Sequence, residues 1–388
     1  MCSIGAYLNL LKYYERVCVC MASAAQSRIK SISYAKYGYI FILPFFIVYC
    51  FFQLWPLIYT FILAFKGNQS AGDSWVGFKN FNDLLFSHPY NKSDLLSSNP
   101  DTKAAARELM SIDVQHQNFV RCLKNTIVLW FGNFIPQIAL SLSLAVFFTD
   151  AKLKIPGTGF FKVIMYMPNI ITAASIAVLF LQLCADTNYS AATILGRSMG
   201  ILKDGEFFNM TKNIPDVVWP PRIIVMFIQT WMWFGNTMIM LMSGIMGINP
   251  SLFEAASIDG ASSGQTFVKI TVPLLSPILV YTVITSMIGG LQMFDMPYLF
   301  TTSKEGQRID NIETIAVYIY DKFHSGAIEP SYGYSGAASV VLFIITAVLG
   351  AIIFRLNRDE EEYRKKKQRK ALIKQQKSKN KQFGGLSI

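Results

Sequence analysis

The sequence predicts an all-α membrane protein that crosses the bilayer six times, and two observations lead to this fold class. Of the 388 residues, 52% are hydrophobic and only 15% are charged, which is typical of membrane proteins. Six windows lack Asp, Glu, Lys, Arg and His over about the 20 residues that a helix needs to span a bilayer. These windows are Gly38–Phe65, Asn125–Thr149, Val163–Leu183, Ile223–Phe253, Leu274–Phe294 and Tyr334–Phe354.

The windows divide the chain into three parts. We expect an N-terminal segment over residues 1–37, a membrane domain over 38–356 and a basic tail over 357–388. Between the first two windows lies a loop of about residues 66–124, in which Ile112 and Phe119 fall on one apolar helical face. This face predicts a helix that lies on the membrane surface before the chain enters the second window.

The basic residues predict the orientation of the six helices. If the loops alternate, one side holds the N-terminal segment, the loop 150–162, a polar insert at 249–273 and the tail from Arg355 onward. These segments carry 21 of the 35 Lys and Arg residues. Because basic residues are enriched on the cytoplasmic side of membrane proteins, both termini and the insert are predicted to be cytoplasmic. The loop 66–124 would then lie outside.

The tail carries much of the net charge of +11. Taken alone, such a basic run is compatible with binding to nucleic acid or to anionic lipid. In a chain with six apolar windows, a solvated tail that fixes the topology is the simpler interpretation. We therefore predict the lipid bilayer, and no nucleic acid, as a partner.

Several kinds of chemistry are not indicated by the sequence. It contains no phosphate-binding G-x-x-x-x-G-K-[ST] motif, and the six cysteines show no metal-binding spacing. We therefore expect that the chain binds neither a nucleotide nor a metal, and that it is not an enzyme. An ATP-independent secondary transporter or channel is an alternative. Secondary transporters keep ionisable groups at mid-membrane, whereas here no window core contains a carboxylate or histidine, apart from Asp295 near the outer end of the fifth.

The polar insert between the fourth and fifth windows predicts two short helices joined by a hinge. Asn249 is a suitable N-cap for the first helix, and Gly260 can end it in the left-handed conformation. Ser262 with Gln265 three residues later forms a capping box that starts the second helix. Pro273 is expected to end the second helix.

The insert resembles the signature of the membrane subunits of ABC importers. That signature has Glu-Ala-Ala, a Gly four residues on, then Ile and Leu-Pro, and only Val272 departs from it here. The surrounding residues are similar to the carbohydrate-uptake branch of these proteins. The resemblance continues through VGFKNF, KNT, GTGFFKVIMYMPNI, WMWFGNTMIMLMSGI, FDMPYLFT and GYSGAAS, from about Lys36 to Phe354.

The resemblance implies a type I ABC importer permease fold in a bacterial cell membrane. It also implies a second permease, usually a different chain, a cytoplasmic ATPase dimer that binds ATP and Mg, and an external sugar-binding protein. In such importers the insert is the coupling helix, seated in a cleft of the ATPase where its glutamate meets basic groups. The matching residues are Glu254, Ala255, Ala256, Asp259, Gly260, Ala261, Ile270 and Pro273.

Ring and amide side chains in the fourth and fifth windows are candidates for lining a sugar passage. Rings contact the apolar faces of sugars, while amides and carboxylates bind hydroxyl groups. Packing between helices is the alternative role for these residues. A glycerol-phosphate type cargo is a second possibility, but a phosphate would call for Lys or Arg, and the windows contain none. The candidates are Trp231, Trp233, Asn236, Gln292, Phe294 and Asp295.

Overall fold

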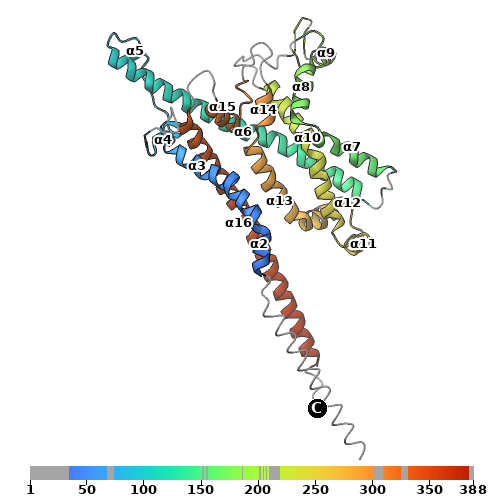
Figure 1. Ribbon diagram of the computed structural model, residues 1–388. Coiled ribbons are helices and arrows are strands. Elements are labelled where there is room, and N and C mark those ends of the chain that lie inside the picture. The colour runs from blue at the N-terminus through green and yellow to red at the C-terminus, as the bar shows by residue number, and fades with distance from the viewer. Residues whose placement is uncertain are drawn as a thin grey trace, which may run out of the picture. The chain divides into compact units, whose positions relative to one another are not determined.

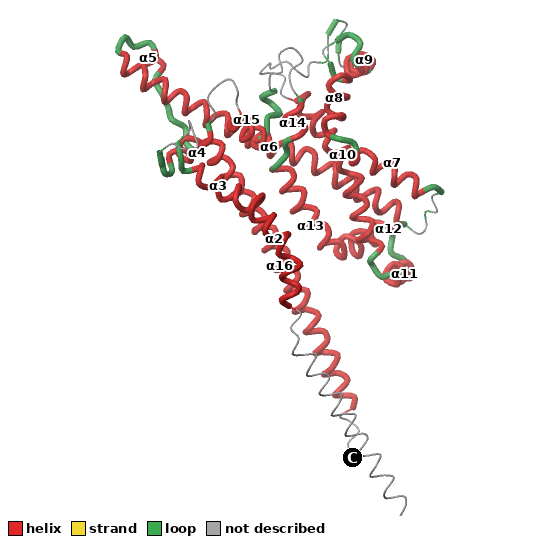
Figure 2. Tube along the Cα trace, in the orientation of Figure 1, coloured by secondary structure: helices red, strands yellow, loops and turns green. Residues whose placement is uncertain are grey.

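The regular elements in the described part of the chain are all helices, apart from one isolated β-bridge between Lys66 and Trp75. Figures 1 and 2 show this all-α architecture. Of the predicted N-terminal segment 1–37, only residues 35–37 fall within the described part. The computed structural model describes residues 35–67, 74–150, 153, 156–185, 187–200, 202–203, 205–206, 208, 219–300, 309–324 and 331–383.

The chain divides into two compact units, residues 1–60 and 61–388, and the described part of the first, residues 35–60, is one interrupted helix. Helix α2 (Ala35–Tyr49) continues through a π-helical turn (Cys50–Leu54) into α3 (Trp55–Ala64), which belongs to the second unit from Phe61 onward. None of the most apolar stretch of this helix is buried inside the chain. A helix that is apolar on all sides and uncovered by its own chain suits a lipid environment or a neighbouring subunit.

The second unit, residues 61–388, holds the remaining helices. Within the described residues, five helices are long and apolar enough to cross a membrane, or six if one bent pair counts as a single span. This agrees with the six predicted windows. The helices are α4 (Lys79–Leu85), α5 (Lys92–Leu95), α6 (Pro100–Thr149), α7 (Thr158–Ile170), α8 (Ala173–Leu183), α9 (Ala191–Ser198), α10 (Trp219–Met246), α11 (Pro250–Ile258), α12 (Ser263–Thr266), α13 (Val272–Leu291), α14 (Asp295–Leu299), α15 (Ile315–His324) and α16 (Tyr332–Phe383).

The bent pair, α7 and α8, lies where the sequence predicts one straight span. The two helices meet at 90°. Pro168, in the last turn of α7, cannot donate a backbone hydrogen bond. Thr172 then starts a new helix, because its side chain accepts a hydrogen bond of 3.3 Å from the backbone N–H of Ser175. These two local features account for the break.

The predicted surface helix is also different in the structure. Residues 100–149 form the single helix α6, so the outer helix and the second span are continuous. Its apolar face is covered by protein: Ile112 and Phe119 are buried, and the Phe119 ring lies 6.1 Å from that of Tyr318 on α15. Packing against α15 therefore replaces the expected contact with the membrane surface.

The predicted stop at Pro273 is wrong, because helix continues from Ser263 to Leu291. A π-helical turn, Phe267–Thr271, joins α12 to α13, and the N–H of Val272 bonds to the carbonyl of Phe267. Pro273 has no N–H to offer an α-helical partner, and it lies at the first positions of α13. The wider π turn lets the chain place proline there without breaking the helix.

The centre of the second unit is the contact between α6 and α10, which lie side by side in Figure 1. Hydrogen bonds cross this contact inside its apolar packing. The Gln137 side-chain amide donates to the Thr237 hydroxyl (2.8 Å), and the Ser141 hydroxyl donates to the Phe234 carbonyl (2.8 Å). Because little water is available there, such bonds fix how the two helices are aligned.

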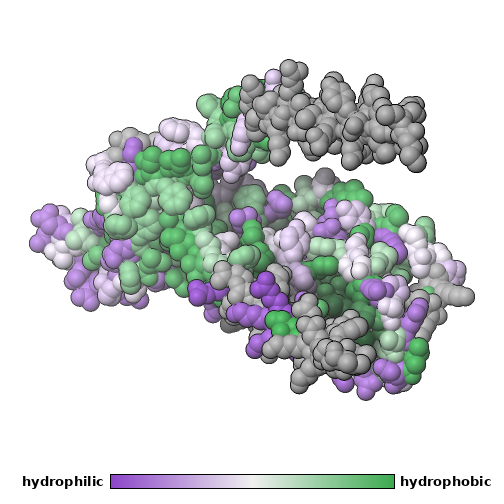
Figure 3. All heavy atoms as spheres, turned by 90° about the horizontal axis from the view of Figure 1, so that it is seen from below, coloured by the Kyte–Doolittle hydropathy of each residue, from purple (hydrophilic) through white to green (hydrophobic). Residues whose placement is uncertain are grey.

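Hydrophobic side chains also gather on the outside of the protein, as the broad green area of Figure 3 shows. Examples from three spans are Phe131 on α6, Phe227 on α10 and Val348 on α16, which are all about half exposed. A surface this rich in large apolar side chains is typical of a protein that is surrounded by lipid.

The end of α3 offers a test of the fold outside the spans. Asn80 is 1% exposed, and its amide donates to the carbonyls of Ala64 (2.9 Å) and Lys66 (2.7 Å). We expect Asn80→Ala to lower the thermal midpoint of the solubilised protein, because two carbonyls lose their donor at a cost of about 1–3 kcal/mol. The neighbouring Asn82→Ala is the control, since Asn82 is exposed. Equal midpoints for the two variants would contradict this role.

Candidate functional site

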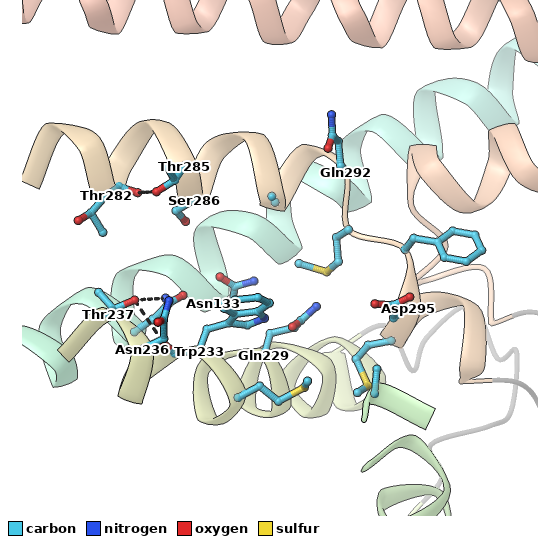
Figure 4. A pocket seen from close by; sticks show the side chains of 18 of the residues that line it. Asn133, Gln229, Trp233, Asn236, Thr237, Thr282, Thr285, Ser286, Gln292 and Asp295 are labelled. Atoms are coloured by element: carbon cyan, nitrogen blue, oxygen red, sulfur yellow. Dashed lines mark hydrogen bonds between the residues drawn. The ribbon is translucent and has the colours of Figure 1, made fainter. Parts of the chain in front are cut away.

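A cavity of about 400 Å³ opens between α6, α10 and α13, and α8 and α14 complete its wall. Amide, hydroxyl and aromatic side chains from different helices converge on it (Figure 4). The polar and aromatic lining residues are Asn133, Gln137, Gln229, Trp233, Asn236, Thr237, Tyr281, Thr282, Thr285, Ser286, Gln292, Phe294 and Asp295.

Helical periodicity explains why these residues meet. On α10, Gln229, Trp233 and Asn236 are spaced four and three residues apart, so they project from one face. The hydroxyl residues of α13 follow the same rule, beginning with Thr282 and Thr285. In Figure 4 the labelled side chains of α13 and α10 lie on facing sides of the cavity. The arrangement therefore follows from two polar stripes that face each other.

Five of the six residues predicted to line a passage do line this cavity: Trp233, Asn236, Gln292, Phe294 and Asp295. Trp231 does not. Two residues away from Trp233, it points to another side of α10, where its ring lies 6.1 Å from that of Phe180 on α8. Trp231 also packs against the apolar core that α8 and α10 share. For Trp231 the packing alternative is the correct one.

The sequence prediction missed much of the cavity wall, including all of α6. Gln137 and Asn133 lie four residues apart in the second window, and Gln229 lies seven residues before the predicted Asn236. A polar residue repeated every three or four positions inside an apolar window was the signal for them. The hydroxyl groups of Thr282, Thr285 and Ser286 gave the same signal in the fifth window.

The lining of the cavity offers hydrogen-bonding groups and aromatic rings. Its amides both donate and accept hydrogen bonds, its hydroxyls do the same, and its rings offer apolar faces. The lining contains one carboxylate, that of Asp295, and no Lys, Arg or His. Among the described residues, no group of three or more His, Cys, Asp and Glu is placed to hold a metal ion. The contacts that this lining offers are hydrogen bonds and ring contacts.

The polar insert begins as predicted, with α11 capped by Asn249. The Asn249 side chain accepts a hydrogen bond of 3.1 Å from the backbone N–H of Ser251. Gly260 has a φ of +73°, the left-handed conformation that ends the helix. The N–H of Ala261 bonds back to the carbonyl of Ala256 over 2.9 Å, which closes the turn.

The second helix of the insert starts with the expected capping box. Gln265 donates its backbone N–H to the Ser262 hydroxyl (3.3 Å), and the Gln265 side chain accepts from the Ser262 backbone N–H (3.0 Å). Two orphan donors are thus satisfied at once. Caps at both ends of the hinge give the insert a defined shape.

The insert residues differ in their exposure. Ala256 is buried and faces inward, whereas Glu254, Ala255, Asp259 and Gly260 are exposed. Ala261, Ile270 and Pro273 are half-buried, so they support the insert more than they form its outer surface. Ile258 is not among the predicted insert residues, and it is 86% exposed at the end of α11. A large apolar side chain at that position was the signal for it.

A family model describes the membrane part of the chain. Residues 137–358 match the binding-protein-dependent transport system inner membrane component family. Among curated proteins, the lactose transport system permease protein of Rhizobium radiobacter is 30% identical over 243 residues, which are 63% of this chain and 77% of that protein. An arabinooligosaccharides transport system permease protein of Bacillus subtilis is 25% identical and spans 87% of this chain and 94% of its own length.

Solved structures show the same fold. A chain in the crystal structure of a bacterial ABC transporter involved in the import of the acidic polysaccharide alginate superposes with a TM-score of 0.64 at 20% identity, covering 86% of this chain and 98% of that one. A second structure, of the alginate transporter with a pentasaccharide-bound periplasmic protein, gives a TM-score of 0.63 at 21% identity, covering 85% and 96%. Since the family model covers more than half of the sequence, the chain belongs to the family of binding-protein-dependent transport system inner membrane components, and it is a multi-pass membrane permease.

Proposed function

We propose that this permease forms, with a second permease, the passage for a sugar or oligosaccharide that an external binding protein delivers. The observation that carries the proposal is the cavity between α6, α10 and α13, because rings, amides and hydroxyls without a basic group suit uncharged hydroxyl-rich solutes. Relatives named for lactose and arabinooligosaccharide transport support this cargo class.

The energy for transport comes from a cytoplasmic ATPase dimer that binds ATP and Mg, and this chain contributes no nucleotide site. The exposed surface of α11, with Glu254, Ala255, Ile258 and Asp259, is the docking surface for that ATPase. We also infer that both termini and the insert are cytoplasmic, in the cell membrane of a bacterium. The balance of basic residues supports this orientation.

The glycerol-phosphate alternative has less support. A phosphate is bound best by Arg or Lys, and the cavity lining contains neither. A secondary transporter or channel working alone would need no ATPase. It would take up sugar in vesicles that contain this chain but no ATPase partner.

Transport by the complex tests the proposal. The complex is purified through a tag on this chain, placed in lipid vesicles and supplied with its binding protein. We expect uptake of labelled sugar only when two conditions are met. ATP must be present on the side of the membrane where the ATPase lies, and loaded binding protein must be present on the other side. Uptake that persists without ATP would favour the secondary-transporter alternative, and no uptake of any sugar in a panel would remove the cargo assignment.

Cavity variants test the assignment of this site. We expect Trp233→Ala or Asn236→Ala to raise the half-saturation of transport several-fold, since each lost contact is worth about 1 kcal/mol, while co-purification with the ATPase is unchanged. The matched control is Trp231→Ala, in the same helix but outside the cavity. It should lower the thermal stability of the protein instead of the affinity for sugar. Unchanged transport in both cavity variants would show that Trp233 and Asn236 serve only to pack the helices.

A further inference from the structure

The charged groups in and around the cavity indicate which solutes within the cargo class it can accept. The cavity lining contains one carboxylate, that of Asp295. Its carboxylate lies at one end of the cavity (Figure 4). The residue is exposed, and among the described residues no hydrogen bond or ion pair involves its side chain. It is the one ionisable acid or base among the cavity residues apart from the phenol of Tyr281. An incoming solute therefore meets a negative charge.

Two arginines that contact the neighbouring segment 309–314 are engaged by other groups. Segment 309–314 is joined to the cavity rim, because the Thr314 hydroxyl donates to the Met293 carbonyl over 2.7 Å. On this segment, Glu313 and Asp310 form ion pairs with Arg121 of α6, at 2.8 and 3.3 Å. Burial raises the pKa of the Glu313 carboxyl, and the attraction of Arg121 opposes that rise. Arg121 is thus directed toward this acidic segment.

Arg222, at the start of α10, is held in the same network. Its guanidinium donates to the Asn125 side-chain oxygen (2.6 Å) and to the Asn311 carbonyl (2.9 Å). Asn125 in turn donates to the carbonyls of Asp310 (2.7 Å) and Glu313 (3.0 Å). Neither Arg121 nor Arg222 belongs to the cavity lining. Both arginines are held by oxygen acceptors of this network.

We propose that Asp295 is a selectivity residue, and that its carboxylate makes the passage accept uncharged saccharides while it rejects uronic acids and sugar phosphates. The inference rests on the proposed function and narrows it. A like charge brought into a partly desolvated cavity is repelled, and water and salt weaken that repulsion only partly. An uncharged sugar meets no such barrier, and its hydroxyls can donate to the carboxylate. This chain shares its fold with a chain of an importer of acidic alginate, but under this proposal it differs from that importer in the charge of the solute it accepts.

The test compares two ligands on one protein. The importer complex in lipid nanodiscs, without its binding protein, is titrated with several uncharged disaccharides and with the matching uronic acids, in which one hydroxymethyl group is a carboxylate. Calorimetry gives the ratio of the two dissociation constants. Because the ratio is internal to each variant, a general loss of affinity does not change it. Asp101→Asn, at an exposed position at the start of α6, is the charge-matched control.

We expect the wild type to bind the uncharged disaccharide about tenfold or more tightly than its uronic acid, a ratio that falls as salt rises. Asp295→Asn should reduce the ratio to about threefold or less, and Asp101→Asn should leave it as in the wild type. Equal binding of both ligands by the wild type, or an unchanged ratio in Asp295→Asn, would overturn the inference and leave the sugar-permease function standing. Absence of binding for every disaccharide would overturn the inference, whereas the proposed function is tested separately by uptake with the loaded binding protein.

Discussion

Replacing Gly235 with alanine is expected to prevent most molecules of the protein from reaching the folded state in the membrane. Gly235 lies on α10 where that helix touches the backbone of α7. A Cβ atom added at Gly235 would overlap the carbonyl oxygen of Met165 and come within 2.9 Å of the Tyr166 Cα. These are backbone atoms and cannot rotate away, so one helix has to move. Overpacking of this kind costs about 3 kcal/mol.

The measurement is the yield and thermal midpoint of detergent-solubilised protein. Gly159→Ala is the matched control, because Gly159 lies on the exposed side of α7 and has no atom within 4 Å of an added Cβ. Alanine also favours a helix over glycine by about 1 kcal/mol, so the control should be as stable as the wild type or slightly more so. A Gly235→Ala protein with the yield and midpoint of the control would show that α7 and α10 do not approach so closely.

The second large effect is expected at Gly260, between α11 and α12. Its φ of +73° is costly for a residue with a side chain, and no atom lies within 4 Å of an added Cβ, so conformation alone should decide the outcome. Valine there should strain the turn by about 1–2 kcal/mol. If the insert transmits the motion of the ATPase, a reoriented α11 should reduce sugar uptake more than tenfold in a chain that is still inserted and stable.

Gly260→Asn is the control, since asparagine adopts the left-handed conformation more readily than other residues. Uptake and ATP hydrolysis are measured together for both variants. We expect hydrolysis in Gly260→Val to fall or to stop responding to loaded binding protein, while Gly260→Asn keeps most of the response. Normal uptake in Gly260→Val, with the ATPase still bound, would make the insert an ordinary connector.

Features that depend on a few consecutive residues could be predicted from the sequence. Long apolar windows predicted the spans, because backbone groups in lipid must bond within a helix. Asn249, Gly260 and the Ser262–Gln265 pair predicted the shape of the insert, since caps and left-handed stops involve atoms only two to five residues apart. The two polar stripes of the cavity were likewise present in the sequence as three- and four-residue repeats.

Other features were not decided by the local sequence pattern. Whether Pro273 ends a helix depends on how the carbonyls before it are hydrogen-bonded. Here a π-helical turn precedes Pro273, and the helix continues. Phe119 belongs to one continuous helix and packs on α15, although its apolar face alone was compatible with a membrane surface. In both cases the local pattern was compatible with two outcomes.

The sequence by itself determined that this chain is helical, spans a membrane and carries a capped, hinged insert, because those properties follow from burial in lipid and from short-range hydrogen bonds. Only the tertiary structure decided which polar residues share a cavity. Trp231 and Trp233 are alike in sequence, but Trp231 packs on Phe180, whereas Trp233 lines the cavity. The physical reason is that helical periodicity fixes the face of the helix from which a side chain projects. Whether that face meets an apolar core or a cavity depends on the neighbouring helices.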